Sequence, residues 1–247
     1  MPALRRGVRI LDFVAAASAP PAAADIARAL SLPRSTAHGL IAAMVDMHLL
    51  VRAADGTYRM GPHLMSWANG FLAQADLVGA FRSAVAGQPD LARLTLTLTI
   101  REGAEVIYLA CNNSSEPLGF TFRIGMRLPA PFAATGKAML AALPLEVVTR
   151  LVADGLPPPM TPRSVQTLPE LLHELEETRA RGWSLDDGQI REGMVCVGAS
   201  VSDHNGTAIA GIATSLLENE ATPETLAYLG NEMRRIAGLL SHRLGAA

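Results

Sequence analysis

The chain has 247 residues, of which 49% are hydrophobic and 18% charged, and its formal net charge is −2 at pH 7. This length exceeds one typical domain and the composition excludes a disordered chain, so we expect two domains, each with its own core. Two cysteines do not make a secreted disulfide framework, and no apolar run approaches the roughly 18 residues of a membrane span. We therefore expect a cytoplasmic protein with no membrane partner.

The charge is unevenly distributed along the chain. The first 75 residues hold seven arginines against four aspartates, whereas the rest holds 14 basic and 19 acidic side chains. A protein that binds the DNA backbone needs such a local positive excess, although solvated surfaces also reach this modest balance by chance. The asymmetry supports a nucleic-acid partner for the N-terminal part but does not identify one.

Three helices are predicted in the N-terminal part, at residues 8–17, 23–30 and 34–47. The last two are separated at Pro33, because proline cannot continue a helix that began before it. Apolar residues recur at helical spacing on one face of the helix at 34–47. A helix pair with such a turn is typical of a helix-turn-helix, whose second helix enters the DNA major groove, but also of an ordinary helical hairpin.

A predicted hairpin follows the helix pair and favours the DNA-binding interpretation. The turn Asp55-Gly56 separates two short runs, and glycine tolerates the positive φ that a tight turn requires. A hairpin directly after a helix-turn-helix is the wing of winged-helix DNA-binding proteins, so we predict such a domain over residues 1–62. The candidate DNA-binding residues are Arg34, Ser35, Thr36, His38 and Gly39 on the second helix, and Arg52 and Arg59 on the two strands of the wing.

Residues 63–86 are compatible with one long helix, in which Leu64, Trp67, Phe71 and Val78 recur at helical spacing. A helix of this length between two domains often serves as a linker that pairs with its copy in a dimer. It also suits a core helix of either domain. We expect a linker helix over 63–86.

The remaining residues, 87–247, alternate predicted strands and helices. Turn signals join several of the strands as hairpins, notably Asp203-His204-Asn205-Gly206. Paired strands surrounded by helices predict an α+β domain with an antiparallel sheet, in the style of small-molecule sensor domains. The expected strands are 94–100, 106–111, 119–124, 194–202 and 208–217, and the expected helices are 132–143, 145–152, 168–181 and 222–244.

Over nearly its whole length the chain resembles the IclR-type bacterial transcription regulators. The resemblance is carried by GVRILDF at 7–13, DIARALSLPRSTAHGL at 25–40, YRMG at 58–61, GMRLPAPFAATGKAMLA at 125–141 and GWSLDDGQIREGMVCVGASV at 182–201. It implies a winged helix-turn-helix, a linker helix and a GAF-like effector-binding domain. It further implies a homodimer or a dimer of dimers, in which effector binding changes how two DNA-binding domains sit on a double-stranded operator.

The resemblance also implies an effector pocket, for which the residues give a physical reason. The sequence Ala134-Thr135-Gly136-Lys137 opens a helix, and free backbone N–H groups at a helix start favour an anion such as a carboxylate. This is not a P-loop, because Pro131 stands at the first glycine position. Regulators similar to this chain often bind a small 2-oxo acid or aromatic acid, and no cofactor is expected. The implied pocket positions are Phe120, Ala134, Thr135, Asp186, Met194, Cys196 and Ser215.

Several of these positions also have a purely structural interpretation. Phe120 and Met194 suit a plain core, and a lone cysteine in an apolar strand, such as Cys196, is usually a small buried hydrophobe. Asp186 suits a cap on the turn after Trp183.

Some residues depart from the family pattern. Gly39 stands where the family usually has an arginine, so base reading is expected to depend on few side chains. Gln189 replaces a usual acidic residue, and Ala213 replaces a hydroxyl residue that some members use to hold a carboxylate. We therefore expect an effector that differs from the simplest keto acids, or a larger pocket.

Two other functions are weighed against the regulator. An enzyme would need Cys196 as a nucleophile with a base nearby, but His204 falls in a predicted turn at the far end of the strand, and the histidines lack metal-ligand spacing. A small-molecule-binding interaction protein with little DNA binding is the alternative that Gly39 favours. We expect a ligand-responsive DNA-binding regulator and not an enzyme.

Overall fold

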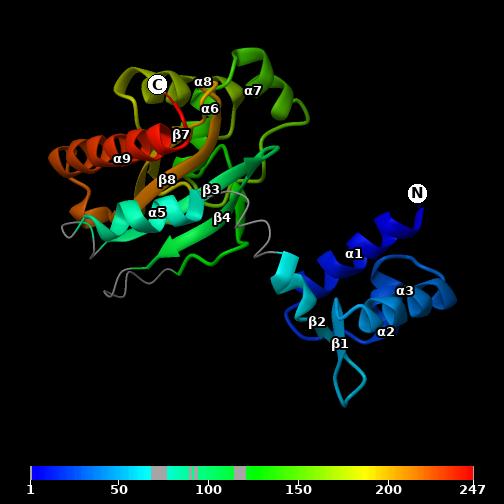
Figure 1. Cartoon of the computed structure of the whole chain (residues 1–247). Helices are drawn as coiled ribbons and strands as arrows, with labels where there is room; N and C mark the ends of the chain where they lie inside the picture. The colour runs from blue at the N-terminus through cyan, green and yellow to red at the C-terminus, as the bar shows by residue number, and fades with distance from the viewer. Residues whose placement is uncertain (1, 68–76, 89–90, 92–93, 114–120, 247) are drawn as a thin grey trace. The chain divides into compact units, whose positions relative to one another are not determined.

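The computed structural model describes residues 2–67, 77–88, 91, 94–113 and 121–246. The chain divides into two compact units, Met1–Ala75 and Asp76–Ala247 (Figure 1). Among the described residues, no helix combines the length and the apolar character that crossing a membrane requires. The two-domain α+β organisation expected from the sequence is confirmed.

In the described part of the N-terminal unit, three helices precede a two-stranded antiparallel hairpin, as predicted, but the first helix begins at Pro2 and not at residue 8. Pro33 is the N-cap of the third helix, and Ser31 in the preceding turn has a positive φ of 52°. The elements are α1 (Pro2–Ala16), α2 (Ala23–Ala29), α3 (Arg34–Asp46), β1 (Leu50–Arg52) and β2 (Tyr58–Met60).

One apolar core holds these elements together. The chain before α2 also joins the hairpin, because Tyr58 N–H donates to Pro21 O at 2.9 Å and Ala22 bridges Thr57. This third partner of the wing was not expected from the sequence. The buried core residues are Ile10, Val14, Ile26, Ile41, Met44, Leu49, Leu50 and Tyr58.

The predicted linker helix is only partly described. Residues 63–67 are helical, and α5 (Leu77–Ala86) is helical. The positions between them lie outside the described residues. A continuous linker helix over 63–86 therefore stays a prediction.

The C-terminal unit is built on a six-stranded antiparallel sheet with the strand order β5-β4-β3-β8-β7-β6. The long hairpin of β7 and β8 and the helix after it have the predicted bounds to within a residue. The strands are β3 (Thr95–Glu102), β4 (Glu105–Asn112), β5 (Arg127–Pro129), β6 (Ser184–Asp187), β7 (Met194–Ser202) and β8 (Ala208–Leu217), and the helices after α5 are α6 (Ala134–Ala141), α7 (Leu145–Leu151), α8 (Leu168–Arg181) and α9 (Pro223–Arg243).

Helices cover both faces of this sheet. On one face, α9 packs against β7 and β8, and α5 packs against β3 and α9; on the other, α6 packs against β7, β8 and α8 (Figure 1). Successive residues of a strand point to opposite faces, so the leucines of β3 face α5 while Thr97 faces α6.

Several helices begin or end at the capping residues that were predicted from the sequence. Thr222 Oγ1 accepts a hydrogen bond from Thr225 N–H at the start of α9, and Pro223 is the first helical residue. Gly182 ends α8 in the left-handed conformation at φ 79°. These signals confirm that cap chemistry places helix boundaries in this chain.

Three expectations about the sheet were wrong or incomplete. Of the strand expected at 119–124, the described residues 121–124 form no strand: Gly125 makes a turn at φ 82°, and backbone hydrogen bonds to β4 begin at Gly125. The short polar strand β6 was not predicted. Asp186 lies within β6 and caps the turn after this strand, not the one after Trp183.

Candidate functional site

The surface of α3 that was predicted to face DNA is exposed. Ala37, Ile41 and Met44 turn into the core. Thr36 is half-buried, between the core-facing side and the exposed side of α3. The exposed residues are Arg34, Ser35, His38, Gly39, Ala42, Ala43 and Asp46.

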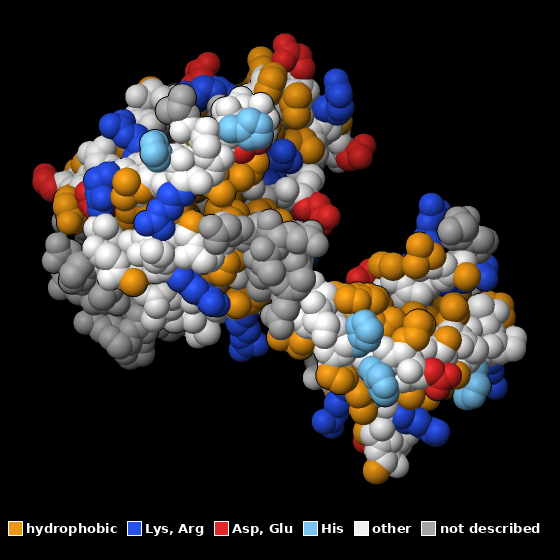
Figure 2. Space-filling model, viewed as in Figure 1, with side chains coloured by type: hydrophobic (Ala, Val, Ile, Leu, Met, Phe, Trp, Pro, Cys, Tyr) orange, Lys and Arg blue, Asp and Glu red, His pale blue; other side chains and the backbone are white. Residues whose placement is uncertain are grey.

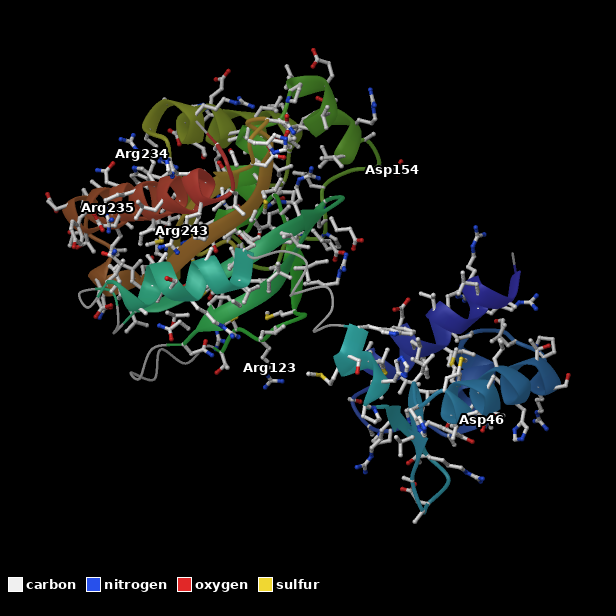
Figure 3. The ribbon with its side chains drawn as sticks, in the orientation of Figure 1. Asp46, Arg123, Asp154, Arg234, Arg235 and Arg243 are labelled. Atoms are coloured by element: carbon white, nitrogen blue, oxygen red, sulfur yellow. The ribbon has the colours of Figure 1, made fainter. Side chains whose placement is uncertain are left out.

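The N-terminal half of α3 is the part best suited to DNA. No side chain caps the helix start at Pro33, so backbone N–H groups of the first turn are open to a phosphate. Asp46, labelled in Figure 3, stands at the other end of the helix and would repel phosphates. A Cβ at Gly39 would meet nothing within 4 Å, so packing within the protein does not require this glycine.

The two arginines of the wing are exposed but point to opposite faces of the hairpin. Arg52 lies opposite Tyr58, and Arg59 is the next residue along β2, where side chains alternate. The turn is held by Asp55, whose Oδ1 accepts hydrogen bonds from Thr57 N–H at 3.0 Å and Thr57 Oγ1 at 2.6 Å. These bonds lower the pKa of Asp55 and hold the turn of the wing in its conformation.

In the C-terminal unit, one cavity between α6 and the sheet brings together six of the seven predicted effector residues. The seventh, Phe120, lies outside the described residues. The space open to the centre of a water molecule is only about 10 Å³, so the cavity, called here the α6 pocket, is nearly filled by its own lining. Its lining is Thr97, Tyr108, Phe122, Ala133, Ala134, Thr135, Asp186, Ile190, Met194, Cys196, Ala213 and Ser215.

Small residues let the start of α6 approach the sheet. A Cβ at Gly211 would lie 2.8 Å from the Thr135 Cβ, and a Cβ at Gly136 would lie 2.2 Å from the Ala130 carbonyl oxygen. Ser184 Oγ donates to the Ala134 carbonyl at 2.6 Å and fixes the helix start from β6. The first turn of α6 is therefore pressed onto the pocket, and no side chain caps it at Ala133.

Several hydroxyl groups line the pocket, and that of Thr135 is unsatisfied. Thr135 is 2% exposed, and its Oγ1 has no hydrogen-bond partner among the described residues. Ser215 Oγ lies 3.2 Å from Cys196 Sγ, and Thr97 Oγ1 donates weakly to Ala213 O at 3.4 Å. A buried polar atom without a partner is uncommon and indicates space for a polar ligand or water.

Asp186 contributes a buried carboxylate to the opposite wall. Its Oδ1 accepts hydrogen bonds from Gln189 N–H at 2.7 Å and Ile190 N–H at 3.3 Å. Burial raises the pKa of Asp186 to about 6, while the nearby positive charge of Lys137 and these hydrogen bonds oppose the rise. The carboxylate therefore ionises in the pH range in which cells operate.

Lys137 and Gln189 belong to a polar chain behind this wall. Lys137 is 1% exposed, and its Nζ lies 2.6 Å from Glu174 Oε2. Gln189 Nε2 donates to Glu174 Oε1 at 2.7 Å, and Gln189 Oε1 accepts from Val165 N–H at 3.3 Å. This chain ties the turn after β6, which carries Ile190, to α8.

Half of the residues that line the α6 pocket were not predicted from the sequence. The alternating Leu-Thr pattern of β3 is the signal that places Thr97 on the α6 side of the sheet. Tyr108 and Phe122 stack with ring centroids 5.0 Å apart, and burial raises the pKa of Tyr108 well above its usual range. Ile190 and Ala133 carry no signal of their own, because only the fold brings them to the pocket.

The sequence matches two domain families. Residues 71–242 match the bacterial transcriptional regulator IclR C-terminal domain. Residues 3–54 match the IclR helix-turn-helix domain. Together these matches span most of the chain.

Known proteins similar to this chain include a repressor and solved structures. The HTH-type transcriptional repressor AllR of Klebsiella pneumoniae is 28% identical over 251 residues, which cover 98% of this chain and 90% of AllR. The crystal structure of the repressor BlcR of Agrobacterium tumefaciens is 53% identical with a TM-score of 0.67, covering 100% of this chain and 98% of that chain. An IclR homolog from Microbacterium hydrocarbonoxydans, crystallised with 4-hydroxybenzoate, is 25% identical with a TM-score of 0.85, covering 99% and 100%.

Proposed function

The chain belongs to the IclR family of bacterial transcriptional regulators, and from this premise we propose which parts of it bind DNA and effector. It is a ligand-responsive DNA-binding regulator, in which a small organic acid in the C-terminal domain modulates operator binding by the N-terminal domain. We propose that residues 1–62 bind DNA, that 63–86 link the domains and that 87–247 bind the effector. The assembly that we propose is a cytoplasmic homodimer or dimer of dimers.

For DNA, we propose that α3 enters the major groove. Arg34, at the helix start, reaches base edges, and Ser35, Thr36 and His38 follow along the same turn. Arg52 and Arg59 of the wing take backbone phosphates on opposite sides of the hairpin. Gly39 leaves room for a close approach of the DNA.

For the effector, the observation that carries the proposal is the arrangement around the start of α6. The start of α6, which no side chain caps, and Thr135, whose hydroxyl has no partner among the described residues, both line one buried cavity. Both groups are hydrogen-bond donors, and the helix dipole adds a favourable field for an anion. We propose that the effector carboxylate lies here.

The far wall of the α6 pocket selects the other end of the effector. When ionised, Asp186 accepts hydrogen bonds and repels a second negative charge. Ser215 and Thr97 can donate or accept. A monocarboxylate with a hydroxyl or another donor group at its other end fits this polarity, and the small resting volume requires the wall to open when it enters. One homologue is crystallised with 4-hydroxybenzoate, an acid of this kind.

We do not propose an enzymatic role for Cys196. Burial raises the pKa of its thiol well above the usual range, so the reactive thiolate is suppressed. His204 lies beyond the other end of β7, more than about 20 Å away at the usual rise of a strand. The contact of Cys196 Sγ with Ser215 Oγ gives it a place in the pocket wall instead.

The experiment that tests the pocket is a thermal-shift screen of small 2-oxo, hydroxy and aromatic acids on three proteins. Thr135→Val and Thr214→Val each remove a buried hydroxyl that has no partner among the described residues, but only Thr135 lines the pocket. An acid at about 100 times its dissociation constant stabilises the folded protein by about 2.7 kcal/mol. We expect this gain in the wild type and in Thr214→Val, and its loss in Thr135→Val. An acid that stabilises all three proteins equally would place the effector elsewhere.

A further inference from the structure

A second cavity in the C-terminal unit lies between α5 and the end of β4. It shares no lining residue with the α6 pocket. The space open to the centre of a water molecule is about 420 Å³, against about 10 Å³ in the α6 pocket. Sites that hold small organic ligands range over roughly 300–1,000 Å³. This cavity, called here the α5 pocket, is therefore large enough for such a ligand as it stands.

The α5 pocket lies where β4 runs past the strand beside it. β5 pairs with β4 only over Glu105–Ile107, while β4 continues to Asn112. Ala110 lies opposite Leu98 of β3, whose side chain faces α5, and cross-strand partners share a face of the sheet. Asn112 lies opposite Leu96, so it faces α5 as well. The end of β4 thus forms one wall of the cavity and α5 forms the other.

The wall that α5 provides is held from behind by α9. Arg235 Nη2 donates to Gln88 Oε1 at 2.7 Å, just beyond the end of α5, and Arg243 Nη1 donates to the Ala80 carbonyl at 3.5 Å. Phe81, which lines the cavity, is only 2% exposed. A wall fixed in this way needs little ordering when a ligand binds, so less of the binding energy is lost.

The lining combines apolar walls with one free cation. Phe81, Val85 and Ala110 are apolar, and Ile124, 61% exposed, stands at the rim. Arg82 lines the same cavity and is exposed, and its guanidinium forms no ion pair or hydrogen bond with any described residue. A guanidinium can hold a carboxylate through two parallel hydrogen bonds. This combination suits a molecule with an apolar body and an anionic head.

The charges on the helices around the α5 pocket also favour an anion. Figure 2 shows basic side chains over α5 and α9 on the face in view, and Figure 3 labels Arg234, Arg235 and Arg243 on α9. Arg235 is paired with Glu232 at 2.8 Å, whereas no described acidic side chain pairs with Arg234 or Arg243. Acidic side chains outnumber basic ones by 19 to 14 in residues 76–247, so this positive region differs from the average of its unit. Its field attracts anions to the mouth of the pocket.

We propose that the α5 pocket binds a second small molecule, an amphipathic monocarboxylate whose carboxylate meets Arg82 and whose aliphatic body lies between α5 and the end of β4. The head stays at the rim, where Arg82 is exposed and the charge keeps part of its hydration. The body is buried against Phe81, Val85 and Ala110. The α6 pocket suits a short acid with a polar group at its other end, whereas the α5 pocket takes a longer acid with an apolar tail. This site goes beyond the proposed function and does not depend on where the effector binds.

Calorimetric titration of the full-length protein with straight-chain acids from butanoate to decanoate, and with 1-octanol, tests the two halves of the site. Affinity should rise about fourfold with each added CH₂ group while the tail is being buried. Octanoate should bind Arg82→Gln about fivefold more weakly than the wild type, because an exposed ion pair is lost. Arg150→Gln removes an exposed arginine of α7 and should bind octanoate as the wild type does. The alcohol should bind all three proteins alike.

Two results of this titration would overturn the proposal. If none of the acids bound, the α5 pocket would not be a site for this class of ligand. If octanoate bound Arg82→Gln as tightly as it binds the wild type, the carboxylate would not meet Arg82.

The two free cysteines report which cavity octanoate fills. Cys111, half-buried, lines the α5 pocket, whereas Cys196, buried, lines the α6 pocket. Saturating octanoate should slow the reaction of Cys111 with N-ethylmaleimide several-fold in the wild type, as mass spectrometry of the labelled peptide measures. Octanoate that binds without protecting Cys111 would lie elsewhere and would contradict the α5 pocket.

A matched pair of substitutions on α5 tests the cavity itself. Ala86→Leu adds an apolar side chain to the lining and should weaken octanoate binding at least several-fold, because the new side chain takes part of the space. Ser83→Leu makes a similar addition at an exposed position outside the lining and should leave binding unchanged. Circular dichroism establishes that both proteins are folded. Equal octanoate affinities in the two folded variants would overturn the proposal.

Discussion

Asp186 is a carboxylate in a place where folding alone favours an uncharged side chain. It is 1% exposed, and burial raises its pKa to about 6 against an ordinary value of 3.8. Lys137 and two backbone N–H groups compensate only part of the cost of burying the charge. An acid kept in such a position is typical of a functional site, and here it lines the α6 pocket.

The raised pKa makes stability depend on pH in a defined direction. The folded protein holds the Asp186 proton more tightly than the unfolded chain, so unfolding becomes easier as pH rises from about 4 to about 6. The Asp186→Asn variant has no carboxyl group to ionise at this position, so it does not lose this stability as pH rises. The free energy of unfolding of the variant minus that of the wild type should rise by roughly 2 kcal/mol between pH 4 and pH 7.5. Urea denaturation across this range measures it, and a difference independent of pH would refute the assignment.

Two exposed arginines should contribute to DNA binding in different ways. Arg34→Ala should weaken operator binding by roughly 1–3 kcal/mol and leave binding to scrambled DNA nearly unchanged, since a base contact carries sequence information. Arg59→Ala should weaken both by a similar factor and lower the salt dependence by about one unit of slope. Fluorescence anisotropy against salt concentration separates the two. If Arg34→Ala weakened binding to operator and scrambled DNA equally, Arg34 would contact a phosphate and not a base.

At the scale of residues, the sequence predicts those pocket residues that belong to a motif or carry a distinctive chemical group. The GKA helix start and the Asp-Asp segment led to Thr135 and Asp186, which the structure brings to one cavity. Ile190 was not predicted, because an apolar residue in a turn gives no sign of the cavity it will line. The unpartnered state of Thr135 likewise depends on how closely α6 approaches β8, which no local pattern encodes.

Two helices contain a glycine for opposite reasons, and this gives a matched pair of substitutions. Gly39 of α3 has open space around a Cβ, whereas Gly136 of α6 has the Ala130 backbone within 2.2 Å. Gly39→Ala should stabilise the protein by about 0.5–1 kcal/mol through helix propensity. Gly136→Ala should destabilise it by roughly 3 kcal/mol through overpacking. Chemical denaturation measures both, and effects of the same sign would mean that the packing around α6 has been misjudged.

The turn after β6 should depend on the uncharged state of Gln189. Its Nε2 donates to Glu174 Oε1, so Gln189→Glu sets two carboxylates against each other and should cost roughly 2 kcal/mol at pH 7. Gln166→Glu on the nearby exposed loop is the control and should stay within about 0.5 kcal/mol. If the Gln189→Glu protein were as stable as this control, the hydrogen bond from Gln189 to Glu174 on α8 would not contribute to the free energy of unfolding.

At the scale of elements, strong periodicity and caps predict well, while short polar segments do not. The bounds of α8, β7 and β8 match the prediction because long patterns end at Gly182 or flank a tight turn. The strand β6 was missed because four residues, two of them aspartates, have no strand propensity. It is extended because it pairs with β7 along the edge of the sheet, a tertiary effect.

At the scale of the whole molecule, function requires that the two units influence each other. An effector that changes operator affinity must be bound with a different affinity when DNA is present, by the same factor. The nearly filled α6 pocket supports such a coupling, since part of its lining has to move when an acid enters. In the proposed homodimer, α3 of a second copy would read the other half of the operator.

The central claim is that this chain binds one selected DNA sequence and releases or tightens it in response to a small organic acid. A mobility shift across tiled fragments upstream of the protein's own gene, with and without the acid that stabilises the protein, tests this most directly. We predict one fragment bound at least about 1,000-fold more tightly than the others, with an affinity that changes when the acid is added. Equal binding of all fragments, or an operator affinity that the stabilising acid leaves unchanged, would contradict it.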